Sequence, residues 1–89
     1  MLVPLGRVVA TPAVLDILTH NRQSVDMFLR RHEQGDWGCL TSSDCRLNNL
    51  AYKHGDRILS AYLLLDKTKI YIITEADRSS TTVLLADEY

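Results

Sequence analysis

The last third of the chain contains segments that are apolar on both sides, and this feature restricts the fold more than any other. Residues 57–64 and 69–75 are rich in β-branched and aromatic side chains, and residues 65–68 form a short connection between them. A third such segment, residues 81–85, follows the polar loop 76–80. In an antiparallel sheet with one solvent-exposed face, the residues along each strand normally alternate between apolar and polar. Either helices cover both faces of this sheet, or one face is an interface.

The preceding residues predict one strand and the first two helices. Residues 5–10 have the short, β-branched profile of a strand. Thr11 followed by Pro12 is typical of a helix start, because threonine caps the helix and proline fits its first turn. Ser24 is the expected cap of a second helix, which ends at Gly35.

A third helix is the clearest local prediction. It follows the capping-box spacing at residues 41–44 and ends at Gly55. We expect its buried face to contain residues spaced by three or four positions: Leu47, Leu50, Ala51 and His54. Together the elements predict a single α+β domain over residues 1–89, in which a small antiparallel meander of three to four strands carries three helices packed mainly on one face. The first strand is expected at an edge of this sheet.

The composition argues against a nucleic-acid-binding, a secreted or a membrane-spanning protein. Ten Lys and Arg oppose eleven Asp and Glu, so the chain lacks the basic excess that is usual in nucleic-acid-binding proteins. The two cysteines, Cys39 and Cys45, are too few for the disulfide framework of a small secreted protein. No leader sequence is evident at the start, and no stretch is long and apolar enough to span a membrane. We therefore expect a cytoplasmic protein without membrane contact.

Four stretches resemble a family of small, uncharacterised bacterial proteins that are encoded on plasmids and integrated mobile elements. They are P-L-G-R-V-V-A-T-P (residues 4–12), G-D-W-G (35–38), R-I-L-S-A-Y (57–62) and K-I-Y-I-I-T-E-A-D-R-S-S-T-T-V-L-L (69–85). The T-E-A-D-R-S-S-T-T part is the most specific, and the resemblance covers most of the chain. It implies an accessory role in mobile-element biology and points to no catalytic residue.

The leading functional hypothesis is a non-enzymatic module that docks onto another protein or onto itself. Its expected contact residues are Trp37, Tyr62, Tyr71 and Arg78. The polar loop around Arg78, which contains Glu75, Asp77, Ser79 and Ser80, is a second candidate binding region. The alternatives are that Trp37 folds over the core and that the loop residues only bond one another to fix a turn.

The second hypothesis is a nucleic-acid-binding regulator or a toxin-like ribonuclease. It uses a basic patch formed by Arg46, Lys53 and Arg57, with Arg78 as an addition. The alternative is a solvated helix face. Enzymatic activity is the less expected outcome, since no nucleophile elbow or phosphate-binding glycine motif occurs. No cofactor is expected, and no metal either, because His32, Cys39, Cys45 and His54 lack the spacing of zinc ligands.

Overall fold

The computed structural model describes residues 1–89 and contains three α-helices, four strands and a C-terminal 3-10 turn. In chain order these are β1 (Arg7–Ala10), α1 (Pro12–His20), α2 (Val25–Glu33), α3 (Ser42–His54), β2 (Ile58–Leu63), β3 (Lys69–Thr74), β4 (Ser80–Leu85) and η1 (Ala86–Glu88). The helix starts follow the sequence signals, because the side chains of Thr11, Ser24 and Thr41 each accept a hydrogen bond from the first turn of their helix. Helix α3 ends at Gly55, which is left-handed with φ 74°.

The four strands form one sheet in the order β1-β4-β3-β2. The α+β class and the antiparallel meander of β2, β3 and β4 are confirmed, and β1 lies at an edge. The expectation of a wholly antiparallel sheet is wrong for β1, which pairs with β4 in the parallel direction. The outer edge of β2 is already occupied by the chain at Gly38, which bridges to Ala61. The remaining place for β1 is beside β4, where α1 follows it directly and packs back on β4.

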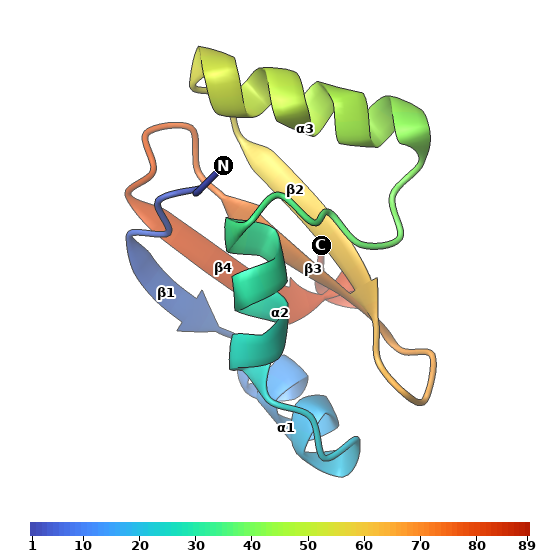
Figure 1. Ribbon diagram of the computed structural model, residues 1–89. Coiled ribbons are helices and arrows are strands. Elements are labelled where there is room, and N and C mark those ends of the chain that lie inside the picture. Colours follow the sequence, from blue (N-terminus) through green and yellow to red (C-terminus); the bar gives the residue numbers. More distant parts are fainter.

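Helices α1 and α2 lie on one face of this sheet, and α3 lies beside its β2 edge (Figure 1). Helices α1 and α2 supply Val14, Leu18, Phe28 and Leu29 to a core whose strand residues are Tyr62, Ile70, Ile72 and Val83. A smaller cluster near α3 joins Val3, Trp37, Ala51 and Ile58. Strand register places all of these strand residues on the same side of the sheet. The prediction that the helices pack mainly on one face is confirmed.

Helix α3 is rotated relative to the prediction from its apolar spacing. Its buried residues are Asn48 and Ala51, whereas Leu47 and Leu50 are 62% and 50% exposed. The Asn48 amide explains this orientation, because its Nδ2 donates to the Leu59 carbonyl at 2.7 Å and its Oδ1 accepts from the Leu59 N–H at 3.3 Å. A side-chain amide therefore docks the helix on β2, and the two leucines remain at the surface.

Candidate functional site

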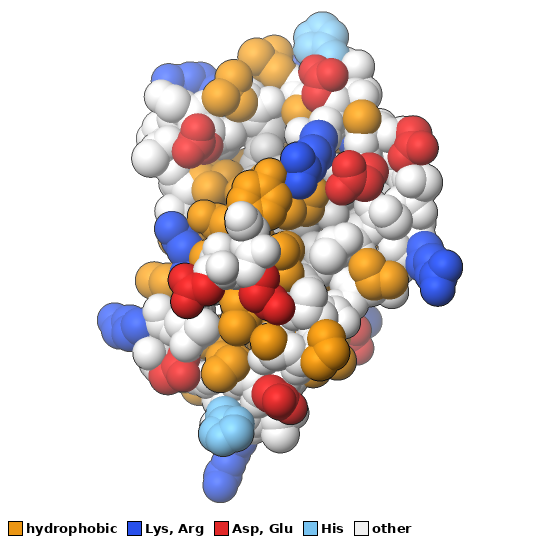
Figure 2. Space-filling model, turned by 180° about the vertical axis from the view of Figure 1, so that it is seen from behind, with side chains coloured by type: hydrophobic (Ala, Val, Ile, Leu, Met, Phe, Trp, Pro, Cys, Tyr) orange, Lys and Arg blue, Asp and Glu red, His pale blue; other side chains and the backbone are white.

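The face of the sheet opposite the helices, called the back face below, is built from alternate residues of all four strands. They are Val9, Leu59, Ala61, Leu63, Tyr71, Ile73, Thr82 and Leu84. Figure 2 shows this side of the molecule, with hydrophobic side chains gathered through its middle and charged side chains around and among them. No helix packs on these residues, yet Ala61, Ile73 and Leu84 in the middle of the face are buried, and only Val9 and Leu63 near its two edges are well exposed.

The C-terminal tail covers part of the back face. The Tyr89 ring meets the Tyr71 ring edge-on at 5.7 Å between centroids, and the Arg57 guanidinium lies 5.4 Å from the Tyr89 centroid. Tyr89 nevertheless stays 62% exposed, and Leu63 and Val9 are 48% and 41% exposed. The tail thus fills the region around Tyr71 and leaves apolar surface on both sides of it.

The apolar surface continues from the sheet toward helix α3. A hollow of about 240 Å³ is lined by Leu40, Asp44, Leu47, Asn48 and Leu59. Leu59 is shared by this hollow and the back face, so the exposed Leu47 of α3 extends the same surface. An exposed apolar area that is continuous over several elements is typical of interaction sites.

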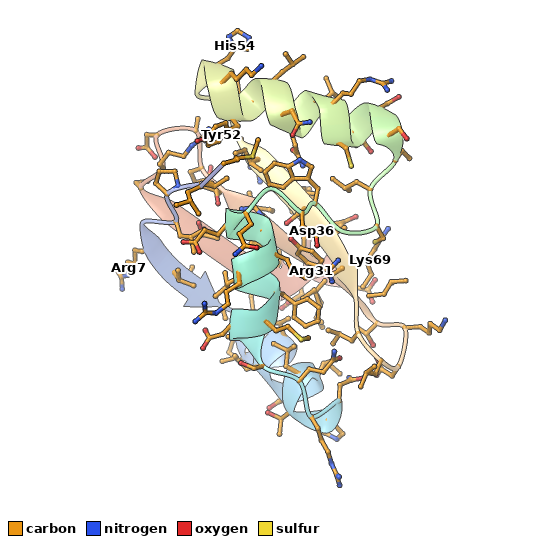
Figure 3. The ribbon with its side chains drawn as sticks, in the orientation of Figure 1. Arg7, Arg31, Asp36, Tyr52, His54 and Lys69 are labelled. Carbon is orange, nitrogen blue, oxygen red and sulfur yellow. The ribbon has the colours of Figure 1, made fainter.

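Charged residues of both signs border the back face. Arg57 Nε lies 3.9 Å from Glu75 Oε2 at one end of β2 and β3. At the other end, the Lys69 ammonium lies 5.9 Å from the Tyr71 ring centroid. Arg7 and Lys69 extend from opposite sides of the molecule (Figure 3). The border is therefore neither uniformly basic nor uniformly acidic.

Only one of the four predicted contact residues lies on this surface, and two of the others are buried. Trp37 is 4% exposed and its Nε1 donates to Asn49 Oδ1 at 3.0 Å. Tyr62 is 1% exposed, its hydroxyl donates to the Asp36 carbonyl at 2.7 Å, and burial raises its pKa to about 12. The prediction that these two rings form an exposed contact surface is wrong, because both turn inward toward the helical layer. Tyr71 does lie on the back face.

Arg78 and the polar loop form hydrogen bonds within the chain. The Arg78 Nη1 group donates to the carbonyls of Asp56, Glu75 and Ala76 at 2.6, 3.1 and 3.3 Å. The Arg78 Nη2 group donates to the Ala51 carbonyl at 3.1 Å. Hydrogen bonds from Ser79 lower the pKa of Asp77, Glu75 faces Arg57, and Ser80 begins β4. The Arg78 guanidinium thus holds the end of α3 against the loop, which leaves its Nη1 and Nη2 groups already engaged.

Replacing Arg78 therefore tests a stabilising role. We expect Arg78→Ala to lower the free energy of unfolding by about 1–3 kcal/mol, because four carbonyl contacts from one partly buried guanidinium are lost. Arg46→Ala on the exposed side of α3 is the control and is expected to change stability by less than about 0.5 kcal/mol. Urea unfolding measures both. Equal stability of the two variants would contradict this role.

The four predicted nucleic-acid-binding cations do not form one patch. Arg46 and Lys53 are exposed on α3, seven positions apart along the helix. Arg57 lies beside Tyr89 at the border of the back face, and Arg78 is engaged as described above. The structure places one pair on α3 and brings the other two, Arg57 and Arg78, to the side chain and the carbonyl of Glu75.

A buried polar network under α2 was not anticipated from the sequence. His32 Nδ1 lies 2.5 Å from Ser60 Oγ and its Nε2 lies 2.8 Å from Thr74 Oγ1. Thr74 Oγ1 lies 2.8 Å from Thr81 Oγ1, which donates to the Leu5 carbonyl at 2.7 Å. The available signal was the polar residues at inward-facing positions of otherwise apolar strands.

The direction of each hydrogen bond in this network follows from counting donors. The Thr81 hydroxyl donates its one proton to the Leu5 carbonyl, so in the Thr74–Thr81 pair the Thr74 hydroxyl must be the donor. Because the Thr74 hydroxyl has then used its own proton, the His32 Nε2–H group must donate to Thr74. Nδ1 is then the acceptor for the Ser60 hydroxyl, and His32 is neutral. The Ser60–His32 pair has the distance of a nucleophile and its base, but both residues are fully buried and no hollow opens onto them, so it has no access to a substrate.

No three His, Cys, Asp or Glu side chains converge as metal ligands would. None of the helices has the length and apolar character needed to cross a bilayer. In comparisons with known proteins, the chain has no significant match to a family model, a curated protein or a solved structure.

Proposed function

We propose that this protein is a non-enzymatic interaction module of the cytoplasm that pairs with a second copy of itself through the back face. One observation carries the proposal: no helix packs on this apolar sheet face, and Val9, Leu63 and the neighbouring Leu47 of α3 remain 41%, 48% and 62% exposed around it. The accessory role on mobile elements that the sequence resemblance implies belongs to the same proposal. The polar interior supports it, since all buried side-chain polar atoms have partners within the chain and none is held ready for a substrate.

The border charges favour a second copy over a partner of one charge sign. A two-fold interface places the same patch on both sides, so it needs acidic and basic groups in one patch. Arg57 and Lys69 supply the bases, and Glu75 and Asp87 supply the acids. Sheets that pack face to face bury their apolar residues in a shared layer about 10 Å thick. A typical interface needs about 800 Å² per copy, which is about 15% of the 5340 Å² surface of this chain.

A matched pair of leucine variants tests the proposal. Leu63→Asp places a carboxylate in the apolar band of the back face, where pairing would bury it unpaired, so we expect the dimer dissociation constant to rise at least about a hundredfold. Leu15→Asp makes the same change on α1, on the opposite side of the sheet, at nearly the same exposure of 46% against 48%. We expect this control to pair like the unmodified chain.

Sedimentation equilibrium provides the measurement. The unmodified chain and Leu15→Asp should approach twice the 10.1 kDa chain mass as concentration rises, and Leu63→Asp should remain at 10.1 kDa. The proposal is wrong if the unmodified chain stays monomeric up to millimolar concentration, or if Leu15→Asp dissociates the dimer and Leu63→Asp does not.

A further inference from the structure

Strand β1 leaves one edge of the sheet open. The Arg7 and Thr11 N–H groups donate to the Ser79 and Val83 carbonyls of the β4 side at 3.0 and 3.1 Å. Because backbone groups alternate along a strand, those of Val8 and Ala10 point away from β4, and they have no hydrogen-bond partner in the chain. The opposite edge of the sheet, formed by β2, differs, because the Cys39 N–H donates to the Ala61 carbonyl at 2.8 Å and so occupies that carbonyl. On β2 only the backbone of Leu63 is left without a partner, whereas two alternate residues of β1, Val8 and Ala10, present free donors and acceptors in strand geometry.

A hollow lies over this open strand, between β1 and helix α2. Its volume is about 370 Å³, and its lining residues are Leu5, Val8, Asp26, Leu29, Arg30 and Glu33. The floor is apolar, and Val8 on it is 43% exposed. The wall on the α2 side carries two carboxylates and one guanidinium, none of which is in an ion pair. The hollow therefore has an apolar floor, and the side chains on its α2 wall carry a net negative charge.

We propose that the β1 edge and this hollow bind an extended segment of another protein by strand addition. The backbone of the segment pairs with the free N–H and C=O groups of Val8 and Ala10. Alternate side chains of an added strand point to the helical side of the sheet, where an apolar one reaches Leu5 and Val8. Lysine or arginine at the neighbouring positions on that side meets Asp26 and Glu33. This site is separate from the back face and goes beyond the pairing proposed above.

A scan of backbone methylation tests the binding mode. The probe is a library of displayed random peptides selected on the full chain, followed by synthesis of one enriched peptide. Methylating one peptide nitrogen at a time removes one N–H without changing the protein. We expect affinity to fall about tenfold or more at every second position and to change little between them, since only alternate N–H groups face β1. The enriched peptides should carry apolar residues in alternation and an excess of lysine and arginine.

A proline variant tests the same contact from the protein side. Val8→Pro removes a backbone N–H that has no partner in the chain, and proline is tolerated at such edge positions. We expect peptide affinity to drop about tenfold or more, while Val8→Ala, which keeps the N–H, retains more of it. If Val8→Pro fails to fold, the methylation scan alone decides.

Three outcomes would overturn the proposed binding site. The first is that no peptide is enriched over the bare support, and the second is a methylation scan in which affinity does not fall at every second position. The third is that the bound peptide shifts backbone amide NMR signals of the back face instead of those of β1 and α2. Leu63→Asp should bind the peptide like the unmodified chain. Loss of pairing and loss of peptide binding are therefore distinguishable.

Discussion

Lowering the pH from 6.5 toward 4 is expected to remove about 3 kcal/mol of folding free energy through the single side chain His32. Burial, together with the positive charge of Arg78, lowers the pKa of His32 from 6.5 to about 4 in the folded protein. Between these pH values the unfolded chain binds a proton at His32 and the folded chain does not, so acid favours unfolding. The contribution is fully present above pH 6.5 and is lost as the pH falls to the folded pKa.

The hydrogen-bond network explains why the folded protein resists protonation at this residue. A proton on Nδ1 would face the Ser60 hydroxyl, which donates to that nitrogen, and the hydroxyl would have to turn away at a site where both residues are fully buried. The Trp37 ring lies edge-on to the imidazole at 5.8 Å between centroids and brings no negative charge. No carboxylate bonds to the ring nitrogens.

Urea unfolding as a function of pH measures this effect, with two histidine variants as comparison. His32→Leu should be less stable at neutral pH by about 2–4 kcal/mol and should lose most of the pH dependence between 6.5 and 4. His20→Leu, at an exposed position of α1, should keep the pH dependence of the unmodified chain. An imidazole titration by NMR that places the pKa of His32 near 6.5 would contradict the account.

Gly38→Ala is expected to destabilise the fold by at least about 3 kcal/mol. A methyl group at this position would overlap the Ala61 carbonyl oxygen and crowd the Tyr62 ring, and neither can move without disturbing the sheet. The substitution would push the chain away from β2, where Cys39 N–H and the Trp37 carbonyl bond to Ala61. Trp37 would then lose its place in the smaller core cluster.

Gly55→Ala separates the steric effect from the backbone effect. The two glycines have nearly the same positive φ, 76° at Gly38 and 74° at Gly55, but nothing lies near a methyl group at Gly55. We expect Gly55→Ala to cost only about 1–2 kcal/mol, which is the penalty of the left-handed conformation. Thermal unfolding of both variants checks the difference. Equal losses would mean that the close approach to β2 contributes nothing.

Local signals were enough to predict most of the secondary structure. Thr11 with Pro12, Ser24 and Thr41 each begin a helix because their side chains bond the first turn, and this depends only on nearby residues. The meander of β2, β3 and β4 is equally local, since short connections join neighbouring antiparallel strands. The two-sided apolar pattern of these strands also anticipated a sheet face without helices.

The failures arose where long-range contacts decide the outcome. Leu47 and Leu50 follow the spacing of a buried helix face, but the amide of Asn48 bonds β2 and turns them outward. The direction of β1 depends on which sheet edge is free, and this is not visible in residues 5–10. Trp37 has glycines on both sides, as an exposed anchor would, yet it packs inward on His32 and bonds Asn49. In each case a contact between distant parts of the chain outweighed the local pattern.

The most direct test of the central claim is an amide-resolved NMR dilution series of the unmodified chain. If the back face is the contact surface, raising the concentration should shift or broaden signals around Leu59, Leu63 and Tyr71 and leave those on the outer side of α2 unchanged. Spectra that stay the same from micromolar to millimolar concentration, or changes confined to the helical side, would contradict the claim.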